Sequence, residues 1–81
     1  MRVTIRLFAR LRDITGRGEI EREIPAGATA ADVWRDLAIE FPEIARYDSS
    51  ISTAVNAEYA KMTTLLADND EVAFLPPVSG G

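Results

Sequence analysis

The sequence predicts an α+β fold in which one mixed β-sheet is packed by a single main helix. Residues 2–8 and 19–24 alternate apolar and polar side chains, which is typical of strands with one buried face. Residues 30–41 carry apolar side chains at helical spacing. Three short apolar segments follow between residues 51 and 75. Two strands, a helix and three further strands therefore make up the predicted chain order.

The first two strands are expected to form a hairpin. Side chains alternate between the two faces of the first strand. Val3, Ile5 and Leu7 point to one face, and Thr4, Arg6 and Phe8 point to the other. A short helical turn over residues 9–14 follows, with Leu11 and Ile14 directed inward. The second strand has its apolar positions at Ile20 and Ile24, and its glutamates face water.

The main helix is expected to run from Ala30 to Phe41. Thr29 is a good N-cap residue, and Asp32 stands at the position of a capping box. Pro42 ends the helix. The apolar side chains lie on one stripe: Val33, Trp34, Leu37, Ala38 and Phe41. On this face Trp34 is predicted to be a core residue, in preference to part of a ligand site.

The second half of the chain supplies the remaining strands. Residues 43–50 are predicted to be irregular, and residues 51–55 to form the third strand. A short, weak fourth strand is expected over residues 58–62. A polar turn at residues 68–70 then leads into the final strand, residues 71–75.

This order fits the β-grasp, or ubiquitin-like, arrangement, in which the first and last strands lie side by side and parallel. Residues 1–75 would form the domain, and residues 76–81 an extended C-terminal tail. Val72 and Phe74 would then lie beneath the helix, with Phe8 and Leu75 on the uncovered face. Tyr59 would join them if its strand is suitably oriented. Such a cluster suggests a surface for a partner protein, although scattered exposed apolar side chains are also normal.

Composition excludes several classes of function. The 81 residues contain no cysteine and no histidine, so a zinc site, a thiol nucleophile and the commonest general base are not expected. No apolar run approaches the ~20 residues of a membrane span. Residues 47–81 carry five acidic side chains against Lys61 alone, which argues against nucleic acid as a partner. We expect a cytoplasmic protein.

The most distinctive stretch is the C-terminal tail. Pro76 and Pro77 have no backbone N–H and cannot continue a sheet. Gly80 and Gly81 have no side chains and could enter a narrow passage. Fully extended, the six residues from Pro76 would reach roughly 20 Å. The α-carboxylate of Gly81 is the most plausible reactive group, although an inert, frayed end is the alternative.

The beginning and the end of the sequence resemble those of the small subunit of molybdopterin synthase, a member of the ubiquitin-like sulfur carriers. The resemblance rests on the opening Leu-Phe-Ala-Arg-Leu-Arg-Asp and, above all, on the closing run from Asp70 to Gly81, Asp-Glu-Val-Ala-Phe-Leu-Pro-Pro-Val-Ser-Gly-Gly. It extends over the whole length of the chain.

The resemblance implies a sulfur carrier that binds no cofactor of its own. An E1-like enzyme would use ATP and Mg²⁺ to adenylate the carboxylate of Gly81, and a sulfur donor system would convert it to a thiocarboxylate. The small subunit would then dock on the large subunit of a heterotetramer, which supplies the catalytic residues. There it would donate sulfur to cyclic pyranopterin monophosphate, building the dithiolene of molybdopterin.

The resemblance also implies which residues contact the partner. The docking positions correspond to Phe8, Tyr59 and Leu75. The tail residues Pro76, Pro77, Val78, Ser79 and Gly80 would enter the active site of the large subunit.

Three other functions remain open at this point. The chain could be the carrier of thiamine thiazole synthesis, a ubiquitin-like modifier joined through Gly81 to lysines, or an interaction module with an inert tail. Deletion of Gly81 separates the last of these from the others.

Overall fold

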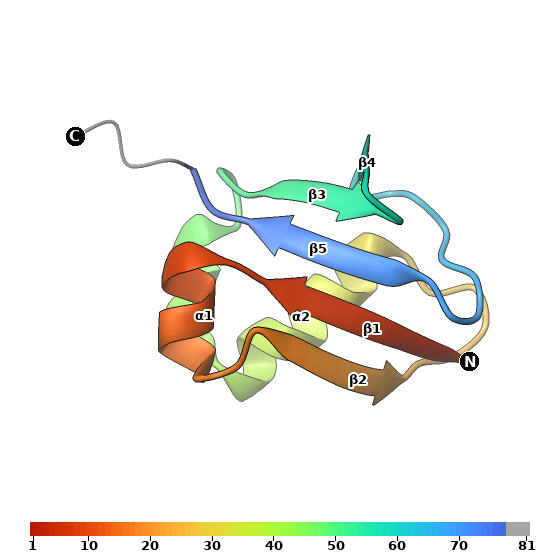
Figure 1. Ribbon diagram of the computed structural model, residues 1–81, viewed down its shortest axis with the longest axis horizontal. Coiled ribbons are helices and arrows are strands. Elements are labelled where there is room, and N and C mark those ends of the chain that lie inside the picture. The colour runs from red at the N-terminus through yellow and green to blue at the C-terminus, as the bar shows by residue number, and fades with distance from the viewer. Residues whose placement is uncertain (78–81) are drawn as a thin grey trace.

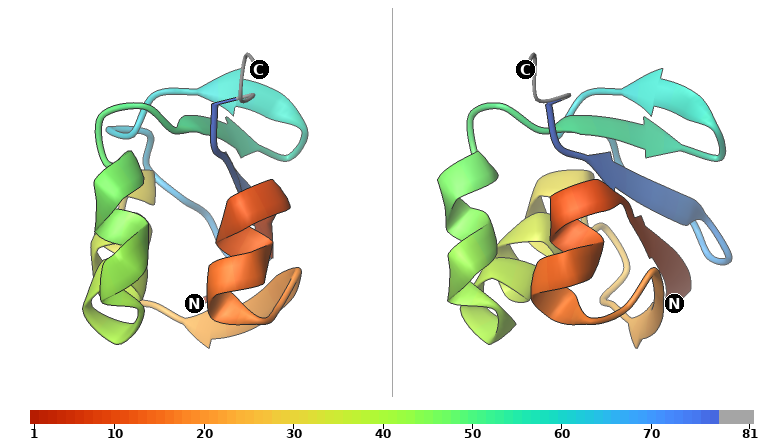
Figure 2. Two further views of the ribbon diagram at one scale, coloured as in Figure 1. Left: turned by 90° about the vertical axis from the view of Figure 1, so that its left-hand side faces the viewer. Right: turned by 60° about the vertical axis from the view of Figure 1, so that its left-hand side comes forward.

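The computed structural model describes residues 1–77, which form one sheet covered on one face by helices (Figure 1). In chain order the elements are β1 (Arg2–Leu7), α1 (Ala9–Thr15), β2 (Glu19–Glu23), α2 (Ala30–Glu40), the 3₁₀ helix η1 (Pro42–Tyr47), β3 (Ser52–Val55), β4 (Glu58–Ala60) and β5 (Glu71–Leu75). Figure 2 shows the sheet and the helices as two layers.

The five strands lie in the order β2-β1-β5-β3-β4. β1 is antiparallel to β2 and parallel to β5, and β3 is antiparallel to both β4 and β5. The predicted β-grasp topology, with the first and last strands adjacent and parallel, is confirmed. The last strand is also the central one.

The core lies between the sheet and α2. The side chains predicted for the inner face of β1 and β5 are fully buried: Val3, Ile5, Leu7, Val72 and Phe74 are each at most 2% exposed. Trp34 packs its ring against Phe74, with 5.1 Å between the ring centroids. Its indole N–H donates to the Asp48 carboxylate at 2.7 Å. The prediction that Trp34 is a core residue is confirmed.

α2 begins as its sequence predicts. The Thr29 hydroxyl accepts a hydrogen bond from the backbone N–H of Asp32, and the Asp32 carboxylate accepts one from the backbone N–H of Thr29. This reciprocal pair satisfies two donors that would otherwise lack partners at the start of the helix.

Several predicted boundaries were wrong. The main helix ends at Glu40 and not at Phe41, the third strand begins at Ser52, and the short first helix extends to Thr15. Residues 43–50 are not irregular throughout, because Pro42 opens a 3₁₀ helix that buries Ile44. The fourth strand ends at Ala60 because the carbonyl of Met62 accepts from the N-terminus of α2 instead of pairing with β3. The first strand ends one residue early, so Phe8 stands between β1 and α1. The second ends at residue 23, just before the loop to α2.

Candidate functional site at the base of the C-terminal tail

The tail starts from the centre of the sheet. Leu75 is the last residue of β5, which is hydrogen bonded on one side to β1 and on the other to β3. Leu75 and Pro76 are half-buried, and Pro77 is exposed. The predicted site residues Val78, Ser79, Gly80 and Gly81 lie outside the described residues. What the structure describes is the platform from which the tail leaves.

This platform is the sheet face that α2 leaves uncovered, which we call the open face (Figure 1). Directly opposed residues on neighbouring strands point to the same face of a sheet. One such row crosses all five strands of the sheet, from β4 to β2: Tyr59, Ala54, Ala73, Arg6 and Glu19. Two alanines, Ala54 on β3 and Ala73 on β5, therefore lie at the centre of the open face, and we call this pair the alanine floor.

Among residues 1–77, Tyr59 is the most exposed large apolar residue on this face. It stands on β4 opposite Ala54, and 84% of its surface is exposed. The condition attached to its prediction, that its strand be oriented toward the open face, is met. Because alanine side chains are short, the surface of the sheet between Tyr59 and β1 is low, and the Tyr59 ring stands at its border.

Phe8 and Leu75 stand at the end of the sheet where the tail leaves. Leu7 of β1 pairs with Phe74 of β5, and both side chains are buried. Phe8 and Leu75 are the residues that directly follow this pair. Phe8 is 39% exposed, and Leu75 pairs with Ser52 of β3. The register thus places Phe8, Leu75 and Tyr59 on or beside the open face, with β3 separating Tyr59 from β5.

Arg6 is a residue of this face that the sequence reasoning did not single out. Its guanidinium carbon lies 5.8 Å from the centre of the Phe8 ring, within the range of a cation–π contact. It also pairs with Glu19 at 3.8 Å and with Glu71 at 3.5 Å. Strand alternation already placed Arg6 and Phe8 on the same face, so the signal was present in the sequence.

The beginning of β5 is fixed by a hydrogen-bonded turn. The Asn56 amide group donates to the Asp70 carboxylate at 2.9 Å and accepts from the backbone N–H of Glu71 at 2.9 Å. The second oxygen of Asp70 accepts from the backbone N–H of Ala67. The Asp68 carboxylate accepts from the backbone N–H of Arg2 at 2.8 Å. These carboxylates therefore hold β5 in register.

Among the described residues, two charged groups have pKa values that are displaced from their ordinary values. Hydrogen bonds from the backbone and hydroxyl of Thr29 hold the pKa of the Asp32 carboxyl below its usual value, and Arg35 adds to this effect. The hydrogen bond and charge of Glu23, with Glu21, raise the pKa of the Arg2 guanidinium. Neither group lies at the base of the tail, so these shifts concern stability.

Within residues 1–77, no group of three or more acidic residues is arranged to hold a metal ion. In the same part of the chain, no helix has the length and hydropathy needed to cross a membrane.

The model of the ThiS family matches residues 5–81, which include both the open-face residues and the tail. The chain belongs to the ThiS family. It is 33% identical over 79 residues to the molybdopterin synthase sulfur carrier subunit of Arabidopsis thaliana, covering 98% of this chain and 82% of that one.

Solved structures related to this ThiS-family chain share its fold. Small archaeal modifier protein 1 (SAMP1) from Haloferax volcanii superposes with a TM-score of 0.87 at 29% identity, covering all of both chains. A chain of the Amycolatopsis orientalis BexX/CysO complex superposes with a TM-score of 0.75 at 27% identity, covering 98% of this chain and 99% of that one. That structure holds a protein of this fold together with a partner protein.

Proposed function

We propose that this protein is the sulfur carrier subunit of molybdopterin synthase and works in the cytoplasm. The observation that carries the proposal is the family match through residue 81, together with the sulfur carrier subunit among its relatives. The placement of β5 supports it, because the strand leads from the core directly to the tail.

The chemistry would take place at the α-carboxylate of Gly81. A carboxylate is a poor electrophile, and adenylation by an E1-like enzyme with ATP and Mg²⁺ would give it a good leaving group. Replacement of that group by sulfur from a donor system would leave a thiocarboxylate. A thiocarboxylate is a soft nucleophile and needs no help from a side chain of this protein, which fits a sequence without cysteine or histidine.

The acceptor would be cyclic pyranopterin monophosphate, bound by the large subunit of a heterotetramer that supplies the catalytic residues. Each carrier delivers one sulfur atom, and a dithiolene contains two, so two charged carriers would be used for each molybdopterin. Gly80 and the residues from Pro76 to Ser79 would lie in the partner's channel. Phe8, Tyr59 and Leu75 would be covered by the large subunit, with the alanine floor allowing a close approach.

A second candidate is a ubiquitin-like protein modifier. The similarity to small archaeal modifier protein 1 favours it. Both functions would begin with adenylation of Gly81 and would differ in the next acceptor, sulfur in one and a lysine amine in the other. The first experiment must therefore separate a thiocarboxylate from an isopeptide bond.

The test is mass spectrometry of the protein after incubation with its E1-like enzyme, ATP, Mg²⁺ and a sulfide source. Exchange of oxygen for sulfur adds about 16 Da, as does oxidation of either methionine. Alkylation resolves the two, because the chain has no cysteine to take the label. A label on the C-terminal peptide is expected for the carrier.

The matched control is the chain lacking Gly81, which should fold normally but take no label and deliver no sulfur. Normal sulfur transfer from this shortened chain would refute the proposal. Linkage of the intact chain to lysines, without labelling, would favour the modifier.

A further inference from the structure

Within residues 1–77, the outer edge of β2 carries unpaired backbone groups. In this part of the chain β2 lies at one end of the strand order and pairs only with β1. The N–H of Ile24 donates to the carbonyl of Met1 at 2.7 Å, and the N–H of Leu7 donates to the carbonyl of Gly18 at 2.9 Å. In an antiparallel pair such bonded positions alternate. The N–H and C=O groups of residues 19, 21 and 23 therefore point away from β1.

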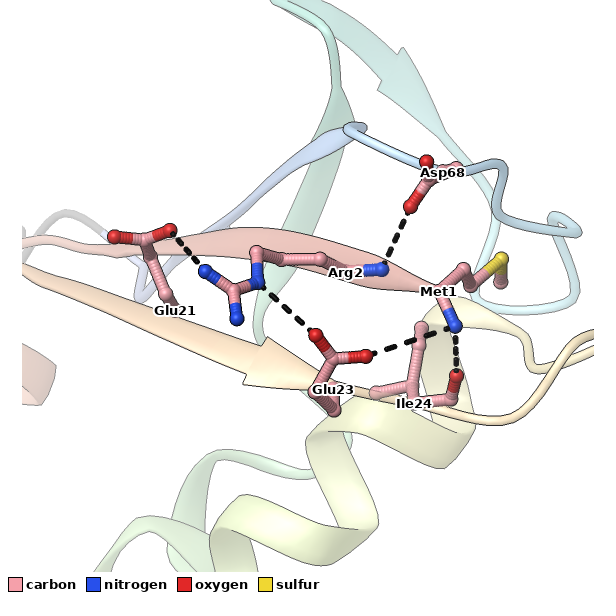
Figure 3. Close-up of polar contacts among 6 residues, drawn as sticks. All are labelled: Met1, Arg2, Glu21, Glu23, Ile24 and Asp68. Atoms are coloured by element: carbon pink, nitrogen blue, oxygen red, sulfur yellow. Dashed lines mark hydrogen bonds and ion pairs between the residues drawn. The ribbon is translucent and has the colours of Figure 1, made fainter.

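The side chains at these three positions are glutamates, and all lie on the open face. Glu19, Glu21 and Glu23 are opposite Arg6, Thr4 and Arg2 in the β1–β2 register. Figure 3 shows Arg2 reaching toward both Glu21 and Glu23, at 3.5 and 3.1 Å. The three glutamate side chains nevertheless remain 60–68% exposed.

A small cavity of about 70 Å³ opens on the other face of the same strand, between β2 and α2. Its apolar lining comes from Ile5, Ile24, Val33 and Leu37. Arg22, Asp36 and Glu40 complete the lining, with Arg22 and Glu40 paired at 2.5 Å. An apolar cavity of roughly 150 Å³ holds a benzene molecule, so a cavity of about half that volume has room for the end of one branched aliphatic side chain.

We propose that the edge of β2 is a docking site for an extended basic peptide segment of a partner protein. The segment adds a sixth strand and bonds to the backbone of residues 19, 21 and 23. Its lysines or arginines lie opposite the three glutamates. A branched aliphatic residue between them lies opposite Arg22 and enters the cavity beside α2.

The charges at the edge of β2 favour a basic peptide segment over a second copy of the chain. Five carboxylates lie at this edge, against three guanidiniums and the N-terminal ammonium of Met1: Glu19, Glu21, Glu23, Asp36 and Glu40, with Arg2, Arg6 and Arg22. Antiparallel pairing of two β2 edges would bring glutamates opposite glutamates, and like charges in that position are destabilising. A basic strand replaces this repulsion by attraction. The open-face residues Phe8, Leu75 and Tyr59 stay free in such a complex.

The experiment uses the full chain and a fluorescent peptide of sequence Lys-Ile-Lys-Ile-Lys, whose pattern is the same in both directions. Binding is measured by anisotropy and located by amide chemical shifts. We expect saturable binding that shifts the amides of Glu19, Glu21 and Glu23. The peptide Lys-Lys-Lys-Ile-Ile has the same charge without the alternation, and an N-methylated version of the first peptide cannot donate hydrogen bonds. Both should bind at least tenfold more weakly.

Three variants complete the test. Glu21→Pro removes an N–H that β1 does not use and should weaken binding roughly tenfold. Glu21→Lys should also weaken it, whereas Glu43→Lys, with the same charge change on η1, should have much less effect. Should Glu21→Pro fail to fold, the N-methylated peptide still decides the question. Equal binding of all peptides, shifts confined to the open face, or self-association through β2 would overturn the proposal.

Discussion

Replacement of Tyr59 by alanine is expected to weaken binding to the partner proposed above, the molybdopterin synthase large subunit, without changing the stability of the fold. Tyr59 is 84% exposed on β4, so it contributes little to the core. On the open face it is well placed to be covered by a partner. Ile39, which is 74% exposed on α2, offers a matched control outside the sheet.

The magnitude follows from the area that the side chain exposes. A tyrosine offers roughly 200 Å² of surface, and at 84% exposure about 170 Å² is available to a partner. At about 25 cal/mol per Å², complete burial would contribute about 4 kcal/mol, and burial of half the area about 2 kcal/mol. The dissociation constant should therefore rise between about 30-fold and about 1000-fold.

Titration calorimetry with the purified large subunit measures this change directly. Ile39→Ala should leave the dissociation constant within about twofold, and thermal unfolding should show both variants folded. An unchanged affinity for Tyr59→Ala, or an equal loss for Ile39→Ala, would show that the open face is not the docking surface.

Three further changes test the fold that supports the site. Asp48→Ala leaves the Trp34 indole N–H without its acceptor and should lower the free energy of unfolding by roughly 1–3 kcal/mol in denaturant titration. Asp32→Asn should be less stable than the parent chain at neutral pH. Because folding lowers the pKa of Asp32, that difference should shrink as the pH falls below about 4 and through the folded value. Ala57→Gly should raise the melting temperature, since Asn56 and Ala57 have φ of 51° and 70° and glycine suits the second position of such a hairpin turn.

Local patterns predicted most of the fold because the relevant information lies within a few residues. Alternation alone assigned Val72 and Phe74 to the core and Leu75 to the other face. The capping box predicted the start of α2 in the same way. Each of these features depends on neighbours in sequence, which is why they could be read without the tertiary structure.

The features that were missed depend on distant contacts or on rare backbone geometry. The end of β4 is set by Met62, whose carbonyl serves α2 instead of the sheet. Phe8 lies off the strand because Ala9 adopts a φ of 50°, a left-handed conformation that an alanine seldom takes and that no sequence pattern announces. The sequence signal for the 3₁₀ helix was limited to Ile44 and Tyr47. They are three residues apart, which is one turn of such a helix, and both pack toward the core.

The position of β5 fixes the point at which the chain leaves the sheet toward its C-terminus. A strand in the centre of a sheet is held by ladders on both sides, whereas an edge strand such as β2 or β4 is held on one. Phe74 adds a fully buried anchor against Trp34, one residue before the end of the strand. The end of β5 is therefore held both by the sheet and by the core. For the proposed carrier, which would meet an activating enzyme and then a synthase, this gives the tail a fixed point of departure, and the edge of β2 offers the separate docking site proposed above.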